Sequence, residues 1–162
     1  MTIGGASKAE LLGRLRSNGI ELNASAENLF ADNRFMTASA TTTVAAVELT
    51  VSDLGLLEGG TMAQIASLAE ARGLGVCPLE LGPHLRLQYV DQPEGSRGQP
   101  VRPHQAPIGS ITIISEPLSA DDDVPKGFYI RRIKGVLWLR GYVSGDDHVW
   151  APDDHLIFCA AG

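Results

Sequence analysis

The chain is poor in cysteine and has no long hydrophobic run. Only two of its 162 residues are cysteine, Cys77 and Cys159, which excludes the disulfide framework of a small secreted domain. The N-terminal stretch MTIGGASKAELLGRL has no basic segment followed by an apolar one, so it does not resemble a secretory signal. No apolar run approaches the roughly 18 residues that a membrane span needs. We therefore expect a soluble, cytoplasmic protein with both thiols free and no membrane partner.

Catalytic and nucleotide-binding motifs are also lacking. The sequence contains no G-x-x-x-x-G-K-[ST] phosphate loop, no dinucleotide fingerprint after a strand and no G-x-S-x-G elbow. Cys77 would need a nearby histidine to act as a nucleophile, and the sequence places neither His84 nor His104 beside it. We predict that Cys77 and Cys159 are small buried residues, and that the protein has no cofactor.

Composition and charge limit the range of partners. Hydrophobic residues make up 44% of the chain and charged residues 20%, which is enough to form a core, so we expect a single domain over residues 1–162. The net charge is −4 over residues 1–81 and −2 over residues 82–162. Neither half is a polyanion binder by overall charge, and binding of nucleic acid would need a local basic patch.

The first half of the chain predicts mainly helices. A capping box of Ser7 and Glu10 precedes a helix over residues 8–18, and Asn23 begins a second, short helix. Thr61 and Gln64 form another capping box ahead of a third helix, which Gly73 ends. The β-branched run at residues 42–51 predicts a strand.

The second half predicts mainly strands. They are expected at residues 85–90, 110–115 and 155–160, with a hairpin of residues 128–133 and 136–143 around a two-residue turn at Lys134-Gly135. Residues 91–109 hold four prolines and predict a long, mobile loop. The fold class is therefore α+β, with helices mainly in the N-terminal half and an antiparallel sheet mainly in the C-terminal half.

The predicted hairpin has two chemically different faces, because a two-residue turn determines which residues lie opposite each other. One face carries Phe128, Ile130, Leu137 and Leu139, with Arg132 at its turn end, and is expected to face the core. The other face carries the five residues that we call the hairpin face: Tyr129, Arg131, Trp138, Arg140 and Tyr142. Arg131 and Arg140 each lie opposite an aromatic ring, which predicts cation–π contacts.

The hairpin face is the candidate binding site. Tyrosine, tryptophan and arginine dominate the strongest contacts of protein interfaces, so we expect a non-enzymatic binding or regulatory module with a protein partner. Alternating aromatic and cationic residues also suit single-stranded nucleic acid, which is an alternative. A third interpretation is that these pairs only stabilise the hairpin or lie beneath the loop of residues 91–109.

Two Asp-Asp-His triplets, at residues 146–148 and 153–155, suggest a different class of function. Carboxylates and imidazoles bind divalent metals, so Asp147, His148, Asp154 and His155 could serve a small metal-assisted enzyme. Aspartate is also a common turn residue, and no recognised metal-ligand spacing occurs. We therefore assign no metal ligand and no catalytic residue.

Two stretches carry a resemblance to a known group of proteins. CPLELGPHLRLQYVDQPEG at residues 77–95 and EPLSADDDVPKGFYIRRIKGVLWLRGY at residues 116–142 resemble small bacterial proteins of no established function, some of which carry the name helicase. The resemblance covers nearly the whole chain and implies a bacterial, cytoplasmic protein. The name implies ATP-driven strand separation, but this chain has no phosphate loop and no room for two motor domains. No functional residue is carried over.

Overall fold

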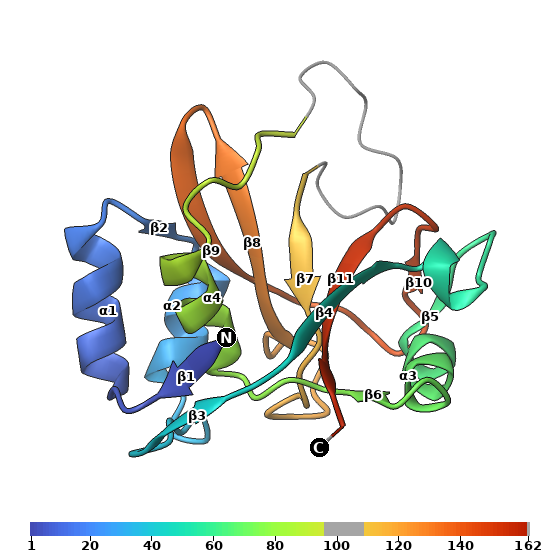
Figure 1. Cartoon of the computed structure of the whole chain (residues 1–162), viewed down its shortest axis with the longest axis horizontal. Helices are drawn as coiled ribbons and strands as arrows, with labels where there is room; N and C mark the ends of the chain where they lie inside the picture. Colours follow the sequence, from blue (N-terminus) through green and yellow to red (C-terminus); the bar gives the residue numbers. More distant parts are fainter. Residues whose placement is uncertain (96–108, 162) are drawn as a thin grey trace.

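The computed structural model describes residues 1–95 and 109–161. Four α-helices lie in the described part: α1 (Lys8–Ser17), α2 (Ala24–Ala31), α3 (Met62–Glu70) and α4 (Leu81–Gln88) (Figure 1). A short 3₁₀ helix, η1, spans Ser52–Leu54. All four α-helices precede the longest strands, which confirms the predicted α+β class with its helices mainly in the N-terminal half. None of the described helices is long and apolar enough to cross a membrane.

The main sheet is mixed, with its long strands in the C-terminal half. Its order is β2 (Glu21–Leu22), β9 (Val136–Tyr142), β8 (Gly127–Ile133), β7 (Ile111–Ile113), β11 (His155–Ala160) and β4 (Ala46–Thr50). Neighbours are antiparallel except for the β2–β9 and β7–β11 pairs, which are parallel. The short strand β6 (Leu74–Gly75) pairs with the end of β11. Two small ladders join β1 (Thr2–Gly4) to β3 (Thr41–Thr43) and β5 (Gly60–Thr61) to β10 (Val149–Trp150).

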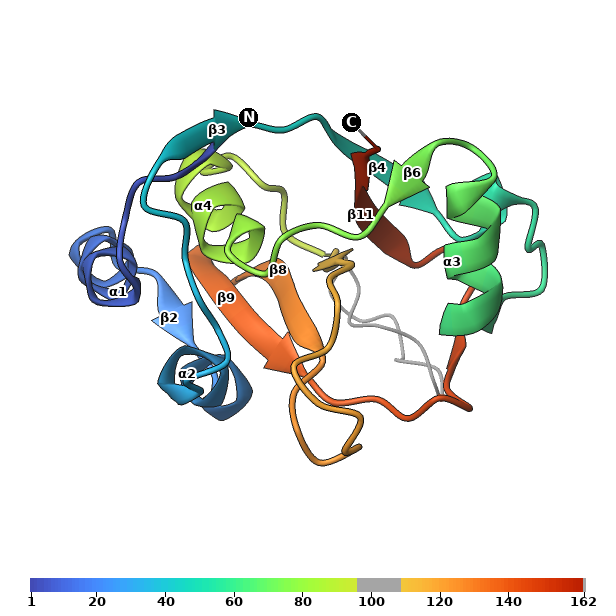
Figure 2. The ribbon, with the colours of Figure 1, turned by 90° about the horizontal axis from the view of Figure 1, so that it is seen from below.

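A hydrophobic core lies on each face of this sheet. The first cluster joins α1, α2 and α4 to β7, β8 and β9. The second cluster joins α3 and η1 to β10 and β11. β11 contributes side chains to both clusters. Ile157 and Cys159 belong to the first cluster, and Leu156 and Phe158 belong to the second. Figure 2 shows α2 and α4 beside β8 and β9, with α3 at the other end of the molecule.

The helix starts follow the predicted capping pattern. The capping boxes of Ser7 with Glu10 and of Thr61 with Gln64 are both formed at the starts of α1 and α3. Asn23 has two roles at the start of α2. Its Oδ1 accepts from the backbone N–H groups of Ala26 at 2.9 Å and Gly141 at 2.8 Å, and its Nδ2 donates to the Gly141 carbonyl at 3.0 Å. One side chain therefore caps a helix and continues the β2–β9 pairing.

The predicted strand at residues 85–90 is wrong, because these residues belong to the end of α4 and the irregular segment after it. The alternation of Leu85, Leu87 and Tyr89 suggested period two over too short a segment to distinguish a strand from a helix. Pro83 lies in the first turn of α4, where its missing N–H would have no helical partner anyway. The helix is therefore compatible with the proline that precedes the alternating stretch.

Two other predictions need correction or fall partly outside the described residues. The strand expected at residues 42–51 is split into β3, which pairs with β1, and β4, which joins the main sheet. The long loop predicted at residues 91–109 is described only at its two ends, because residues 96–108 lie outside the described part. At its start Gln92 is buried, and its Nε2 donates to the carbonyls of Gly109 at 3.0 Å and Ile130 at 3.2 Å.

Candidate functional site

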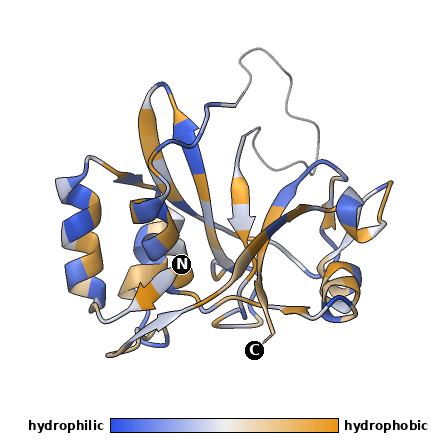
Figure 3. Ribbon diagram, viewed as in Figure 1, coloured by the Kyte–Doolittle hydropathy of each residue, from blue (hydrophilic) through white to orange (hydrophobic). Residues whose placement is uncertain are grey.

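The hairpin of β8 and β9 has the predicted turn and register. Lys134 and Gly135 both have positive φ, at 49° and 79°, which is the geometry of a type I′ turn. Arg131 pairs with Trp138, and Tyr129 pairs with Arg140. The bands of Figure 3 show hydrophilic and hydrophobic residues alternating along this hairpin. Tyr129, Arg131, Trp138, Arg140 and Tyr142 therefore share one face, as the sequence indicated.

Arg140 organises the aromatic rings of the hairpin face. Its guanidinium carbon lies 5.1 Å from the centre of the Trp138 ring and 5.8 Å from the centre of the Tyr129 ring. Both distances are within the range of cation–π attraction. Of the two arginines expected to contact a ring, Arg140 does so, whereas Arg131 contacts no ring in the part of the chain that is described. All five side chains of the hairpin face are half-buried.

The rings of the hairpin face differ in how they are supported. Tyr142 packs against the second core cluster and contacts Trp150 edge-on, with 5.8 Å between the ring centres. Tyr129 and Trp138 belong to neither cluster among the described residues. Burial raises the pKa of the Tyr129 hydroxyl, although the charges of Arg140 and Arg131 oppose this effect. Among the described residues, Arg140 contacts both the Tyr129 and the Trp138 ring.

The hairpin is a local basic segment in an acidic chain. Residues 127–142 contain four cations, Arg131, Arg132, Lys134 and Arg140, and no acidic residue. Within the described ranges, no carboxylate lies within ion-pair distance of any of these four side chains. Glu94 lies near the turn, where its carboxylate accepts from the backbone N–H of Gly135. The positive charge of the hairpin is therefore not neutralised by ion pairs with described residues.

A buried arginine that the sequence did not indicate supports the hairpin from the core side. Arg86 of α4 is fully buried, and its Nη1 donates to the Gln92 side chain at 2.6 Å. The same atom lies 3.4 Å from the carbonyl of Arg131 and 3.3 Å from that of Trp138. Nη2 donates to the Tyr89 carbonyl. Burial lowers the pKa of Arg86 to about 10, so the guanidinium is charged at neutral pH.

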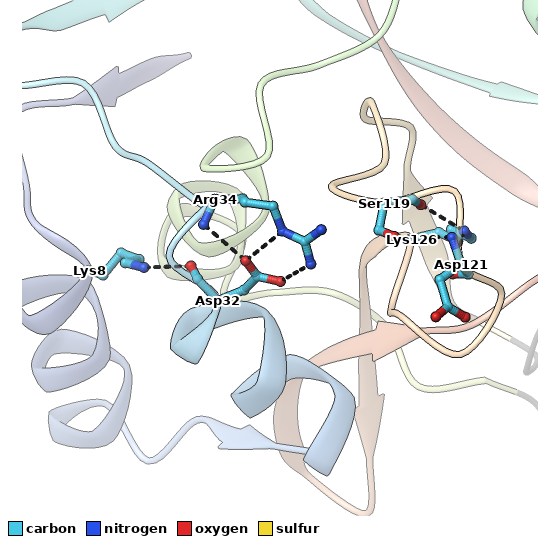
Figure 4. A network of polar contacts seen from close by, with 6 residues as sticks. All are labelled: Lys8, Asp32, Arg34, Ser119, Asp121 and Lys126. Atoms are coloured by element: carbon cyan, nitrogen blue, oxygen red, sulfur yellow. Dashed lines mark hydrogen bonds and ion pairs between the residues drawn. The ribbon is translucent and has the colours of Figure 1, made fainter.

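A cavity of about 620 Å³ adjoins the hairpin face at Tyr142. Its walls are mainly apolar and come from α3, the residue after β6, the end of β7, the connection between β7 and β8, and the segment after β9. They include Met62, Ala66, Val76, Ile114 and Leu118. Ser115 also lines the cavity, and its buried Oγ has no hydrogen-bond partner among the described residues. Lys126 Nζ donates to the carbonyls of Ser119 at 2.9 Å and Asp121 at 2.8 Å, which folds residues 116–126 along the rim (Figure 4).

The Asp-Asp-His triplets do not converge on a metal site. Asp154 is buried, and its Oδ2 accepts from the backbone N–H of Ala151, which is turn chemistry. His155 Nδ1 lies 3.0 Å from Glu48 on β4, and His148 contacts the Trp150 ring edge-on at 5.0 Å. Among the described residues no group of three or more histidine, cysteine, aspartate or glutamate side chains could hold a metal ion. The structure therefore offers no support for the metal-assisted alternative.

The two cysteines are buried, as predicted, and neither forms a disulfide. The described contacts of the Cys77 sulfur are with Cys159 and the Ile157 carbonyl, so no described histidine is placed to activate it, and His104 lies outside the described residues. His84 instead accepts from the backbone N–H of Gly4 through Nε2, at 3.1 Å. Burial raises the pKa of the Cys77 thiol, which opposes a role as the activated thiolate nucleophile of an enzyme.

Comparison with known proteins adds no further evidence. No protein-family model matches the chain, and neither does any curated protein or solved structure. The resemblance to small bacterial proteins stays a prediction. Among the described residues, the hairpin face with its adjoining cavity is the strongest candidate site.

Proposed function

We propose that this protein is a non-enzymatic binding module whose hairpin face holds an acidic, extended segment of a protein partner. The observation that carries the proposal is the contact of Arg140 with both the Trp138 and the Tyr129 ring, in a segment with four cations and no acid. Arginine and aromatic side chains contribute most of the affinity at protein interfaces. Arginine also pairs with carboxylates through two parallel hydrogen bonds.

The distribution of charge favours an acidic peptide over a long polyanion. The net charge of the chain is −6 and residues 127–142 carry +4, so the rest of the chain carries −10. A short acidic segment needs to contact only the hairpin. A nucleic acid that extends beyond the hairpin would meet the negative potential of the surrounding surface.

The hydrogen bonds that hold the hairpin backbone in place also favour binding of a partner. The Arg86 guanidinium contacts the backbone carbonyls of Arg131 and Trp138, the two residues that face each other across the hairpin. Asn23 holds the backbone of Gly141, next to Arg140. A surface that is already rigid loses less conformational entropy when a partner binds.

The experiment compares two double variants with the same change of net charge. In Arg131→Gln with Arg140→Gln, both cations leave the hairpin face; in Arg14→Gln with Arg16→Gln, two exposed cations leave α1 instead. The probe is a fluorescent peptide of alternating glutamate and valine, which favours an extended chain, and binding is followed by fluorescence anisotropy. We expect the hairpin variant to bind about 10-fold more weakly, at roughly 0.7 kcal/mol for each lost charge pair, and the α1 variant to bind like wild type.

Two further measurements test the choice of partner. Trp138→Ala with Arg140→Ala removes the ring and the cation that stacks on it, and should abolish measurable binding of the peptide. A labelled oligothymidylate tests the alternative ligand. If it binds more tightly than the peptide, with affinity that falls steeply as salt rises, the face is a nucleic-acid site and the proposal is wrong. Equal peptide affinity in both charge-matched variants also overturns it.

A further inference from the structure

Two cysteines that are distant in sequence meet in the core. Cys77 and Cys159 are 82 residues apart, yet their sulfur atoms are 2.9 Å from each other. Cys159 lies on β11 opposite Gly75 of β6, and Cys77 follows Gly75 by two residues. Both side chains belong to the first core cluster, with 2% of Cys77 and 7% of Cys159 exposed. The sulfur atoms need to approach by only about 0.9 Å to reach the length of a disulfide bond.

We propose that Cys77 and Cys159 are a reversible oxidation site, at which hydrogen peroxide converts the two thiols into an intramolecular disulfide. In the first step the Cys159 sulfur attacks one peroxide oxygen and the O–O bond breaks, which gives a sulfenic acid and water. In the second step the Cys77 sulfur attacks the Cys159 sulfur, the S–O bond breaks, and the hydroxyl leaves as water with the Cys77 proton. The sum is two thiols and one peroxide giving one disulfide and two waters.

The surroundings of the two thiols set this order of steps. Cys159 is the more exposed of the two and lies one residue before Ala160, which is exposed at the end of β11. Because Cys159 lies beside this exposed end of the strand, peroxide reaches Cys159 first. Cys77 lies deeper and is directed toward the Ile157 carbonyl at 3.7 Å. A sulfenic acid on Cys159 therefore has a resolving thiol beside it before a second oxidant arrives.

The bond would tie β11 to the segment that leads into α4. It would close a loop across the 82-residue separation, and that loop contains α4, β7 and the whole hairpin. Closing so long a loop restricts the unfolded chain more than the folded one. We expect the melting temperature of the oxidised protein to exceed that of the reduced protein by roughly 10 °C.

The test uses the full chain, reduced and then treated with hydrogen peroxide. The protein is denatured, its remaining thiols are alkylated with N-ethylmaleimide, and peptides are mapped by mass spectrometry. We expect a cross-linked peptide that contains both cysteines, no alkylated cysteine, and two alkylated cysteines again after dithiothreitol. Peptide mapping also separates this product from oxidation of Met36, which is 80% exposed. Two alkylated thiols after peroxide, or a lower melting temperature of the cross-linked form, would overturn the proposal.

The single variants test the order of the two steps. In Cys77→Ser the sulfenic acid on Cys159 has no resolving thiol, so a dimedone probe should label it. In Cys159→Ser the remaining Cys77 should stay a free thiol at the same peroxide dose. Equal labelling of both variants would refute the order of attack. Absence of the cross-link in wild type would refute the site itself, whatever the variants show.

Discussion

Asn23 gives the most quantitative test of how this structure is held together. Its side chain makes three hydrogen bonds at once: one caps α2 through Ala26 N–H, and two pair with the backbone N–H and carbonyl of Gly141 on β9. The two roles can be separated by substitution. In Asn23→Ser the serine still caps the helix, but it is too short to reach both groups of Gly141. In Asn23→Ala both roles are lost.

The expected losses follow from the number of bonds removed. A partly buried hydrogen bond contributes about 1 kcal/mol, so Asn23→Ser should lower the free energy of unfolding by roughly 2 kcal/mol. Loss of the helix cap costs about 1 kcal/mol more, so Asn23→Ala should lower it by roughly 3 kcal/mol. For a chain of this length the alanine variant should melt about 6–12 °C below wild type.

Urea denaturation followed by tryptophan fluorescence measures both losses. Asn18→Ala is a matched control, because the Asn18 side chain makes one exposed bond, to the Arg14 carbonyl at 2.7 Å, and should cost at most about 0.5 kcal/mol. Wild-type stability in Asn23→Ser would show that the pairing with Gly141 contributes nothing. Equal losses of unfolding free energy in Asn23→Ser and Asn23→Ala would show that the helix cap contributes nothing to stability.

Three other predictions use the same denaturation assay. Burial lowers the pKa of His84, so the unfolded chain binds the proton more tightly and the free energy of unfolding should fall as the pH drops below about 6.5. His84→Gln should make this fall less steep, and an unchanged pH dependence would show that another group causes it. Arg86→Met leaves four acceptors without their donor and should cost about 3 kcal/mol; a loss below about 1 kcal/mol would contradict this role. Gly82→Ala places a Cβ 2.7 Å from the Phe128 ring and should lower the free energy of unfolding by about 1–3 kcal/mol. Gly13→Ala meets open space in α1 and should raise it by roughly 0.5–1 kcal/mol. Changes of the same sign in the two variants would refute the clash at Gly82.

Local features of this fold could be predicted from the sequence. The turn at Lys134-Gly135 needs two residues with positive φ, and that requirement alone determines which side chains share the hairpin face. The capping boxes at Ser7 and Thr61 are equally local, since each depends on residues three positions apart. These elements have the predicted positions because no distant contact competes with them.

The features that were missed depend on contacts between distant segments. The side chain of Arg86 is buried because α4 packs behind the hairpin, and the alternation around it gave no sign of a helix. Both cysteines were expected in the core, but nothing in the sequence indicates that residues 82 positions apart would touch. The cavity beside Tyr142 is lined by α3, by the chain between β7 and β8 and by the segment after β9, whose relative positions depend on the completed sheet.

The placement of β11 has a consequence for the order of assembly. This strand follows all the others in the described chain, yet it lies inside the sheet, between β4 on one side and β7 and β6 on the other. During synthesis, residues 155–160 leave the ribosome after every strand that they will join. Until they do, neither hydrophobic core is closed, because alternate side chains of this one strand complete both. The two faces of the molecule should therefore gain their protection from hydrogen exchange together, and late.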